Sequence, residues 1–204
     1  MIRIVDYGLG NVQAFLSLYK KLGFEVMRAR TAVDLADATK IILPGVGAFD
    51  HAIEMLNQSG MRLALETSVF ENVVPVLGIC VGMQILASSS DEGRLPGLGW
   101  IPGKVRAFKS NDKSAHLPQP HMGWNNVYPK LGSPLFEGLE SDARFYFLHS
   151  YYFDCDNLEN NVGNASYGLD FTCAVSAKNI YGVQFHPEKS HHFGLKLLKN
   201  FAEL

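Results

Sequence analysis

The sequence predicts an α/β fold with a mixed, mostly parallel central sheet, and two observations indicate it. Residues 2–86 alternate short β-branched runs with stretches of helical periodicity, as parallel βαβ units do. From Trp100 onward, strand-like runs follow one another, so antiparallel pairs should complete the sheet. A chain of 204 residues, 47% hydrophobic and 19% charged, can bury one substantial core. We therefore expect a single domain, residues 1–204.

The first half of the chain contains three expected strands. The β-branched runs IRIV (2–5), KIIL (40–43) and VPVL (74–77) each fit a buried strand. Between the first two, residues 11–22 have helical periodicity; Asn11 is a favoured capping residue and Gly23 stops the helix. A second helical segment, MQILA, follows the third strand after the residues GICVG.

The second half reads mostly as strands. The expected strands are GKVRAF (103–108), WNNVYP (124–129), RFYFLHSYYF (144–153) and a hairpin-like FTCAVSAKNIYGVQF (171–185). An amphipathic helix over residues 192–202 ends the pattern. The polar residues 110–116 read as a mobile loop.

Composition and charge argue against several kinds of partner. The formal net charge is −2 and the lysines and arginines are scattered, so no basic patch for nucleic acid is expected. No apolar run reaches the roughly 20 residues needed to cross a bilayer. The three widely spaced cysteines do not form a disulfide framework, and the N-terminus MIRIVDYG has no secretory pattern. We therefore expect a reducing, cytoplasmic environment and no membrane partner.

One of the three cysteines lies in a segment whose pattern is typical of a reactive thiol. VPVLGICVGMQIL (74–86) describes a strand, a tight turn and a helix, with Cys80 between Gly78 and Gly82. This is the arrangement of a nucleophile elbow, in which glycines permit a strained turn and the nucleophile sits at a helix N-terminus. The partial positive charge there favours thiolate over thiol. Taken alone, the segment also fits a buried structural thiol.

A nucleophilic thiol needs a base, and YGVQFHPEKS supplies one. His186 follows an alternating apolar run and precedes Pro187, so it lies at the end of a strand, where the active sites of open α/β sheets gather. Glu188 is close enough for a turn to bring its carboxylate to the imidazole. Taken alone, the pair also fits a surface histidine beside a salt-bridging glutamate.

Acyl chemistry also needs donors for a developing oxyanion. In IILPGVGAFD, glycines flank Val46 after a buried strand, so the amides of Val46 and Gly47 can turn toward a neighbouring loop. The amide of Val81, directly after the elbow cysteine, would be the second donor. PGVG also fits an ordinary strand-to-helix turn. DYGLGNVQ has Gln13 where a dinucleotide fingerprint needs its third glycine, which argues against a nucleotide site.

Taken together, these segments resemble a known family. LPGVGAF, LGICVGMQ and GVQFHPEKS, in this order and at these separations, are similar to the motifs of the triad-type, class I glutamine amidotransferases over nearly the whole chain. Within that family, DYGLGN, PHMGWN, FYFLHSYY and KLLKNF resemble the glutaminase subunits of imidazole glycerol phosphate synthases. The resemblance implies a flavodoxin-like three-layer sandwich, in agreement with the two-part pattern above.

The resemblance also implies a reaction. Cys80 would attack the side-chain amide of L-glutamine to form a thioester, His186 would shuttle the proton, and Glu188 would orient His186. The ammonia would pass to a separate (β/α)8-barrel cyclase subunit that makes imidazole glycerol phosphate and aminoimidazole carboxamide ribotide in histidine biosynthesis. The positions that match the family's substrate contacts are Gln84, His149, Ser150 and Tyr151. The positions that match its partner contacts are Trp124, Asn125, Tyr146 and Lys189.

Other functions remain open on the sequence. The same glutaminase motifs would serve a paralogue that supplies ammonia to another synthase, for instance in amination of a surface-polysaccharide sugar. Two readings outside this family are an elbow-cysteine chaperone or stress-response module, and a cysteine peptidase or esterase. Neither a metal nor a cofactor is expected, because the remaining cysteines and histidines show no metal-ligand spacing. His121, inside PHMGWN, is interpreted as structural.

Overall fold

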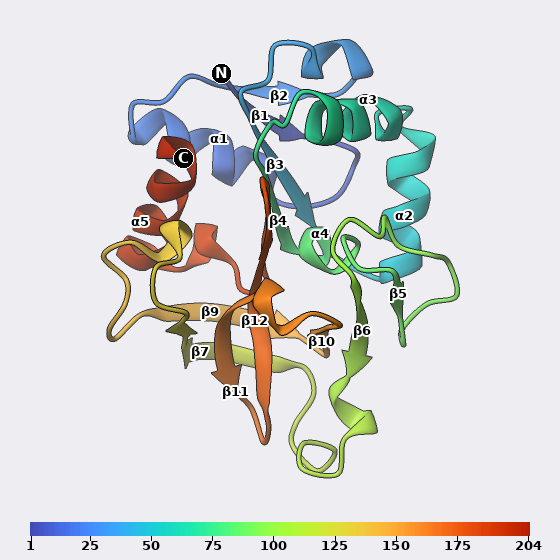
Figure 1. The fold of residues 1–204 in the computed structure, drawn as a ribbon, viewed down its shortest axis with the longest axis vertical. Helices are drawn as coiled ribbons and strands as arrows, with labels where there is room; N and C mark the ends of the chain where they lie inside the picture. Colours follow the sequence, from blue (N-terminus) through green and yellow to red (C-terminus); the bar gives the residue numbers. More distant parts are fainter.

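A mixed sheet of eleven strands runs through the structure, a computed structural model that describes residues 1–204 (Figure 1). Its main path runs β2-β1-β3-β4-β13-β12-β10-β6-β5, and β11 and β8 are attached beside β12. The strands are β1 Ile2–Val5, β2 Val26–Ala29, β3 Lys40–Gly45, β4 Val76–Cys80, β5 Ser89–Ser90, β6 Gly103–Ala107, β8 Tyr128–Pro129, β10 Tyr151–Cys155, β11 Asn161–Ser166, β12 Asp170–Ala177 and β13 Ile180–Val183.

The strand pairing changes from parallel to antiparallel at β13. Strands β2, β1, β3, β4 and β13 pair in parallel, and β12 then pairs antiparallel with both β13 and β10. Strand β13 comes late in the chain but lies directly beside β4, with Val183 opposite Ile79. The carboxyl ends of β3, β4 and β13 therefore meet at one edge, although they come from three distant segments.

Helices cover both faces of this sheet. The helices are α1 Val12–Lys21, α2 Phe49–Gln58, α3 Arg62–Glu66, α4 Val81–Gln84 and α5 His191–Glu203. Helices α1 and α5 contact each other on one side, while α2 and α3 lie on the other (Figure 1). A cluster of 55 buried hydrophobic residues fills the space between the layers. The predicted α/β three-layer arrangement with a mixed sheet is confirmed.

The short helical turns are η1 Ala32–Leu35, η2 Thr67–Glu71, η3 Phe108–Ser110, η4 Pro134–Phe136, η5 Leu158–Asn160 and η6 Pro187–Lys189. Residues 110–116 form turns, and the buried Ser114 hydroxyl donates to the Phe108 carbonyl at 2.7 Å, which ties this segment to the end of β6. No helix has the length and apolar character needed to cross a membrane.

The helix expected over MQILA is shorter than its periodicity suggests. Helix α4 ends at Gln84, because the following carbonyls accept hydrogen bonds from a later segment instead of from their own helix. Ile85 and Leu86 accept from the amides of Leu98 and Ile101, at 2.8 and 3.1 Å. The chain can therefore turn away toward β5 after one helical turn.

The run RFYFLHSYYF is two strands rather than one. Arg144–His149 (β9) pairs with His121–Asn126 (β7) in a separate two-stranded sheet, whereas β10 belongs to the main sheet. Ser150 is the break between them. The chain crosses from one sheet to the other at this residue, beside the carboxyl end of β4.

Candidate active site

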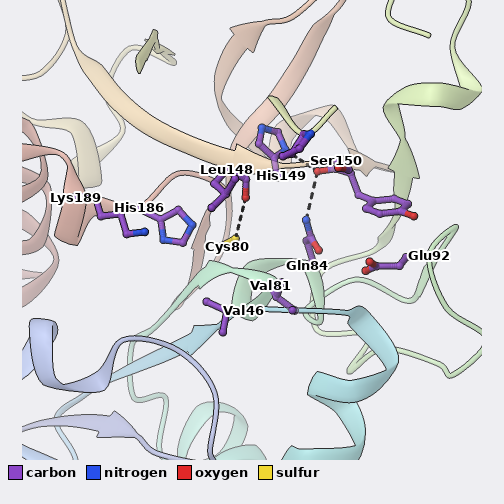
Figure 2. Close-up of a pocket in the computed structure, with 13 residues that line it drawn as sticks. Val46, Cys80, Val81, Gln84, Glu92, Leu148, His149, Ser150, His186 and Lys189 are labelled. Atoms are coloured by element: carbon purple, nitrogen blue, oxygen red, sulfur yellow. Dashed lines mark hydrogen bonds between the residues drawn. The ribbon is translucent and has the colours of Figure 1, made fainter. Parts of the chain in front are cut away.

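A cavity of about 290 Å³ opens where the carboxyl ends of β3, β4 and β13 meet the crossing between β9 and β10 (Figure 2). Most of the residues predicted to act in chemistry or substrate binding face it. The lining residues are Val46, Gly47, Cys80, Val81, Gln84, Glu92, Pro120, Leu148, His149, Ser150, Tyr151, His186 and Lys189.

The strand, tight turn and helix expected of a nucleophile elbow are present around Cys80. Cys80 has φ +56° and ψ −113°, a conformation that L-residues rarely adopt, and it is the N-cap of α4. A Cβ on Gly82 would collide with the Leu43 carbonyl oxygen, and one on Gly78 would collide with the backbone of Gly82. Because both flanking residues lack a side chain, the turn packs against β3 and the strained cysteine is held at the cavity floor.

The predicted base and its orienting carboxylate also come together. His186 Nδ1 lies 2.9 Å from Glu188 Oε1, and both side chains are buried. Pro187 opens the turn η6, which brings Glu188 back toward the imidazole. Burial by itself lowers the pKa of His186, but hydrogen bonds to Cys80 and Glu188 and their negative charges outweigh it and raise that pKa to about 10. His186 is therefore protonated at neutral pH and lines the same cavity as Cys80.

The predicted oxyanion donors lie around the same thiol. The N–H groups of Val46 and Gly47 donate no hydrogen bond within the chain. Val81 is the first residue of α4, so its N–H has no acceptor in its own helix. Gly47 has φ +88°, which glycine adopts without strain. Free amides on two sides of Cys80 are what a developing oxyanion requires.

Polar groups for a ligand line the far side of the cavity. Gln84 Nε2 donates to the Tyr151 carbonyl at 3.3 Å and to Gln184 Oε1 at 3.0 Å, so its Oε1 is the atom left to accept from a ligand (Figure 2). The Ser150 N–H has no acceptor within the chain. The His149 ring turns away and its Nδ1 contacts the Tyr151 carbonyl at 2.7 Å, so His149 offers its backbone to the cavity.

Three residues that contact this site, two through side chains and one through a backbone carbonyl, were missed at the sequence level. Glu92 lines the cavity, and its Oε2 accepts from the Phe49 amide at 2.9 Å. The Leu148 carbonyl accepts from the Cys80 thiol at 3.9 Å, and Gln184 Nε2 donates to the same sulfur at 3.7 Å. The acidic residues of SSSDEG and Gln184, two positions before His186, can be seen in the sequence. Nothing in their spacing indicates that Glu92 lines the cavity or that Gln184 contacts Cys80.

Three of the four predicted partner contacts gather on the surface beside the cavity. Lys189 Nζ lies 5.6 Å from the centre of the Tyr146 ring, and Trp124 meets the same ring edge-on. His191, not among the predicted contacts, stacks on Trp124 with ring centres 5.3 Å apart. Asn125 does not join this group, because successive strand residues face opposite sides and its amide is bonded to His121 and Ser166.

The other cysteines have no such surroundings. Burial raises the pKa of Cys155 to about 12 and that of Cys173 further still, so neither is a reactive thiolate at neutral pH. Nowhere in the structure do three His, Cys, Asp or Glu side chains gather as they would around a metal ion.

Comparisons with known proteins agree with this geometry. The family model for glutamine amidotransferase class-I matches residues 3–204. Two imidazole glycerol phosphate synthase subunits HisH, from Bdellovibrio bacteriovorus and Leptospira interrogans, are 65% and 50% identical to the chain, each over the full length of both proteins. A crystal structure of a glutamine amidotransferase has the same fold, with a TM-score of 0.77 and 20% identity over 99% of this chain and 97% of its own. The chain belongs to the class I glutamine amidotransferase family.

Proposed function

We propose that residues 1–204 form one glutaminase domain that hydrolyses L-glutamine and supplies ammonia to an imidazole glycerol phosphate synthase. The observation that carries this proposal is the buried Cys80–His186–Glu188 arrangement on the floor of a cavity lined by free amides. The full-length identity to relatives named as subunits of that synthase supports the choice of pathway.

The first half-reaction forms a thioester. His186 holds the proton of the Cys80–His186 pair at neutral pH, and Cys80 Sγ attacks the side-chain carbonyl carbon of glutamine, so that the carbonyl oxygen becomes an oxyanion. The amide of Val81, together with that of Val46 or Gly47, stabilises this charge. His186 then gives its proton to the amide nitrogen, so the carbon–nitrogen bond breaks and ammonia leaves. Glu188 stabilises the charged imidazole throughout.

The second half-reaction restores the thiol. Water attacks the thioester carbon while His186 accepts one of its protons, and the same amides bind the second oxyanion. The carbon–sulfur bond then breaks, the proton stays on His186 beside the Cys80 sulfur, and glutamate is released. Each step uses proton transfer and electrostatic stabilisation by the chain's own groups, so the proposal includes no cofactor.

Polar groups around the cavity match the α-ammonium and α-carboxylate groups of glutamine. The Glu92 carboxylate suits the α-ammonium group, and the free Ser150 N–H suits the α-carboxylate. Gln84 Oε1 can accept from a substrate N–H, because both protons of its own amide are already used. A free amino acid satisfies these groups together, whereas a peptide bond at either end would remove one of the charges.

The ammonia acceptor would bind at the surface beside the cavity. Lys189 lines the cavity and also contacts Tyr146. It therefore lies between the catalytic residues and the surface cluster of Trp124, Tyr146 and His191. We propose that a (β/α)8-barrel cyclase subunit docks here and receives the ammonia directly. Since the nucleophile is a free thiol, we place the pair in the reducing cytoplasm.

The experiment that tests this function replaces Cys80 by serine and assays the chain with its cyclase partner. Glutamine-dependent formation of imidazole glycerol phosphate should be lost, while formation from added ammonium salts should persist, because the substitution removes only the ammonia source. Cys155→Ser is the matched control and should retain both activities. A Cys80→Ser protein that still hydrolyses glutamine would refute the assignment, and a wild-type protein that hydrolyses glutamine without yielding this product would point to another acceptor.

A further inference from the structure

Behind the nucleophile lies a buried amide that the reaction described above does not use. Gln184 follows β13, two residues before His186, and its side chain has no exposed surface. Its Nε2 lies 3.7 Å from Cys80 Sγ, within hydrogen-bond range for sulfur, and its Oε1 lies 3.0 Å from Gln84 Nε2. The amide therefore connects the substrate-facing Gln84 with the nucleophilic sulfur.

The direction of these hydrogen bonds follows from one backbone carbonyl. The Tyr151 oxygen can only accept, so the Gln84 atom beside it at 3.3 Å must be the NH₂ group. That group gives its second proton to Gln184, whose nearer atom is then the oxygen. The other end of the Gln184 amide, the end that faces Cys80, is consequently the NH₂ donor.

A second branch of the same network holds the carbonyl in place. His149 Nδ1 donates to the Tyr151 oxygen at 2.7 Å, so its Nε2 accepts from His121 Nδ1 at 2.9 Å. His121 Nε2 in turn accepts from the Asn125 amide at 3.2 Å. Both imidazoles are buried, and each ring nitrogen of the two histidines has a hydrogen-bond partner. Hydrogen bonds from β7 and from Gln84 thus converge on the Tyr151 carbonyl, and the second proton of Gln84 continues the network through Gln184 to the active-site sulfur.

We propose that Gln184 is a positioning residue for the nucleophile: its N–H group donates to the Cys80 sulfur, stabilises the thiolate relative to the thiol, and holds the sulfur toward His186. An N–H donor interacts more strongly with a charged acceptor than with a neutral one, so its effect is largest when the thiol has lost its proton. The inference rests on Cys80 being the nucleophile of the proposed function. The titratable groups closest to the sulfur are His186, with Glu188 behind it, and the buried Tyr7.

The test measures how fast iodoacetamide alkylates Cys80 across pH, with mass spectrometry of the Cys80 peptide. Gln184→Met keeps the length of the side chain but removes the donor. We expect the pH midpoint of alkylation to rise by about one unit, and the rate below that midpoint to fall about tenfold. With the cyclase partner, glutamine turnover should show a lower kcat and a nearly unchanged KM, because the substrate contacts remain.

A matched control separates this effect from lost stability. Asn200 carries a buried side-chain amide that donates to the Leu135 and Glu137 carbonyls, away from the cavity. Asn200→Leu should lower the melting temperature but leave the alkylation midpoint of Cys80 where it is in the wild type. A shift of equal size in this variant would overturn the inference.

The remaining outcomes are also decisive. Gln184→Glu replaces the donor by an acceptor and should raise the midpoint further than Gln184→Met; it also carries the test if the methionine variant does not fold. A folded Gln184 variant with the wild-type midpoint overturns the inference and leaves the proposed function standing. Wild-type Cys80 that reacts no faster than Cys155 at any pH would overturn both.

Discussion

Acid should destabilise this protein through a pair of buried histidines. His121 and His149 expose only 4% and 5% of their surfaces. Burial is the main cause that lowers the pKa of His121 to about 4 and that of His149 to about 3, from an ordinary value of 6.5. The unfolded chain therefore takes up a proton at each site below pH 6.5, whereas the native protein resists protonation until pH 4 or lower.

The size of the effect follows from these values. Each histidine contributes stability that is complete above pH 6.5 and is lost as the pH falls toward its native pKa, at about 1.4 kcal/mol per pH unit. Between pH 6.5 and pH 5 the pair should thus lose about 3 kcal/mol, and the slope should approach about 2.7 kcal/mol per pH unit below pH 6. His186 has a raised pKa of about 10, so its contribution is complete below pH 6.5 and is lost only as the pH rises toward 10.

The assay is urea unfolding at a series of pH values between 4.5 and 7, on the wild type and on His121→Phe. Phenylalanine keeps the ring that stacks on Phe147 and Tyr167 but removes one titrating group. The slope of unfolding free energy against pH should fall by about half. His116→Asn, at an exposed histidine, is the control and should keep the wild-type slope. Equal slopes for His121→Phe and the wild type would refute the argument.

Three further predictions concern the active site. His186→Asn should lower glutamine turnover by several orders of magnitude and Glu188→Gln by less, since orientation is secondary to proton transfer; equal and small losses in steady-state assays would argue against the triad. Gly82→Ala should cost about 3 kcal/mol or more in urea unfolding because its Cβ meets the backbone of β3, whereas Gly99→Ala, in open space, should cost only the backbone penalty of about 1 kcal/mol; similar costs would contradict this packing argument. The isolated chain should hydrolyse glutamine about 100-fold more slowly than the complex with its cyclase and the cyclase ligand, because the glycines on both sides of Val46 let its peptide turn an amide away from the oxyanion until the partner favours the donating orientation; equal rates would exclude this gating by a peptide flip.

The geometry of the candidate catalytic centre could be predicted from the sequence because its parts are local. The elbow needs small residues on both sides of Cys80, and the His186–Glu188 pair needs only a turn after a strand. Parallel strands present their carboxyl ends at one edge of a sheet, so the two segments were expected to meet although 106 positions separate Cys80 from His186. Gln84 and residues 149–151 were identified only through resemblance to the family.

What the sequence by itself determined, then, is the alternation of strands and helices, the glycines at the elbow and the residue types of the triad, because backbone sterics and hydrophobic periodicity act over a few positions. Only the tertiary structure decided that the run 144–153 breaks at Ser150 and that Asn125 faces His121 instead of the surface cluster around Trp124. It also decided that Glu92 reaches the cavity and that Gln184 reaches the Cys80 sulfur. Each of these depends on which strands pair and in what register. Competing long-range contacts decide which strands pair. The periodicity of the sequence indicates which face of a strand is buried, but it does not indicate which neighbour covers that face.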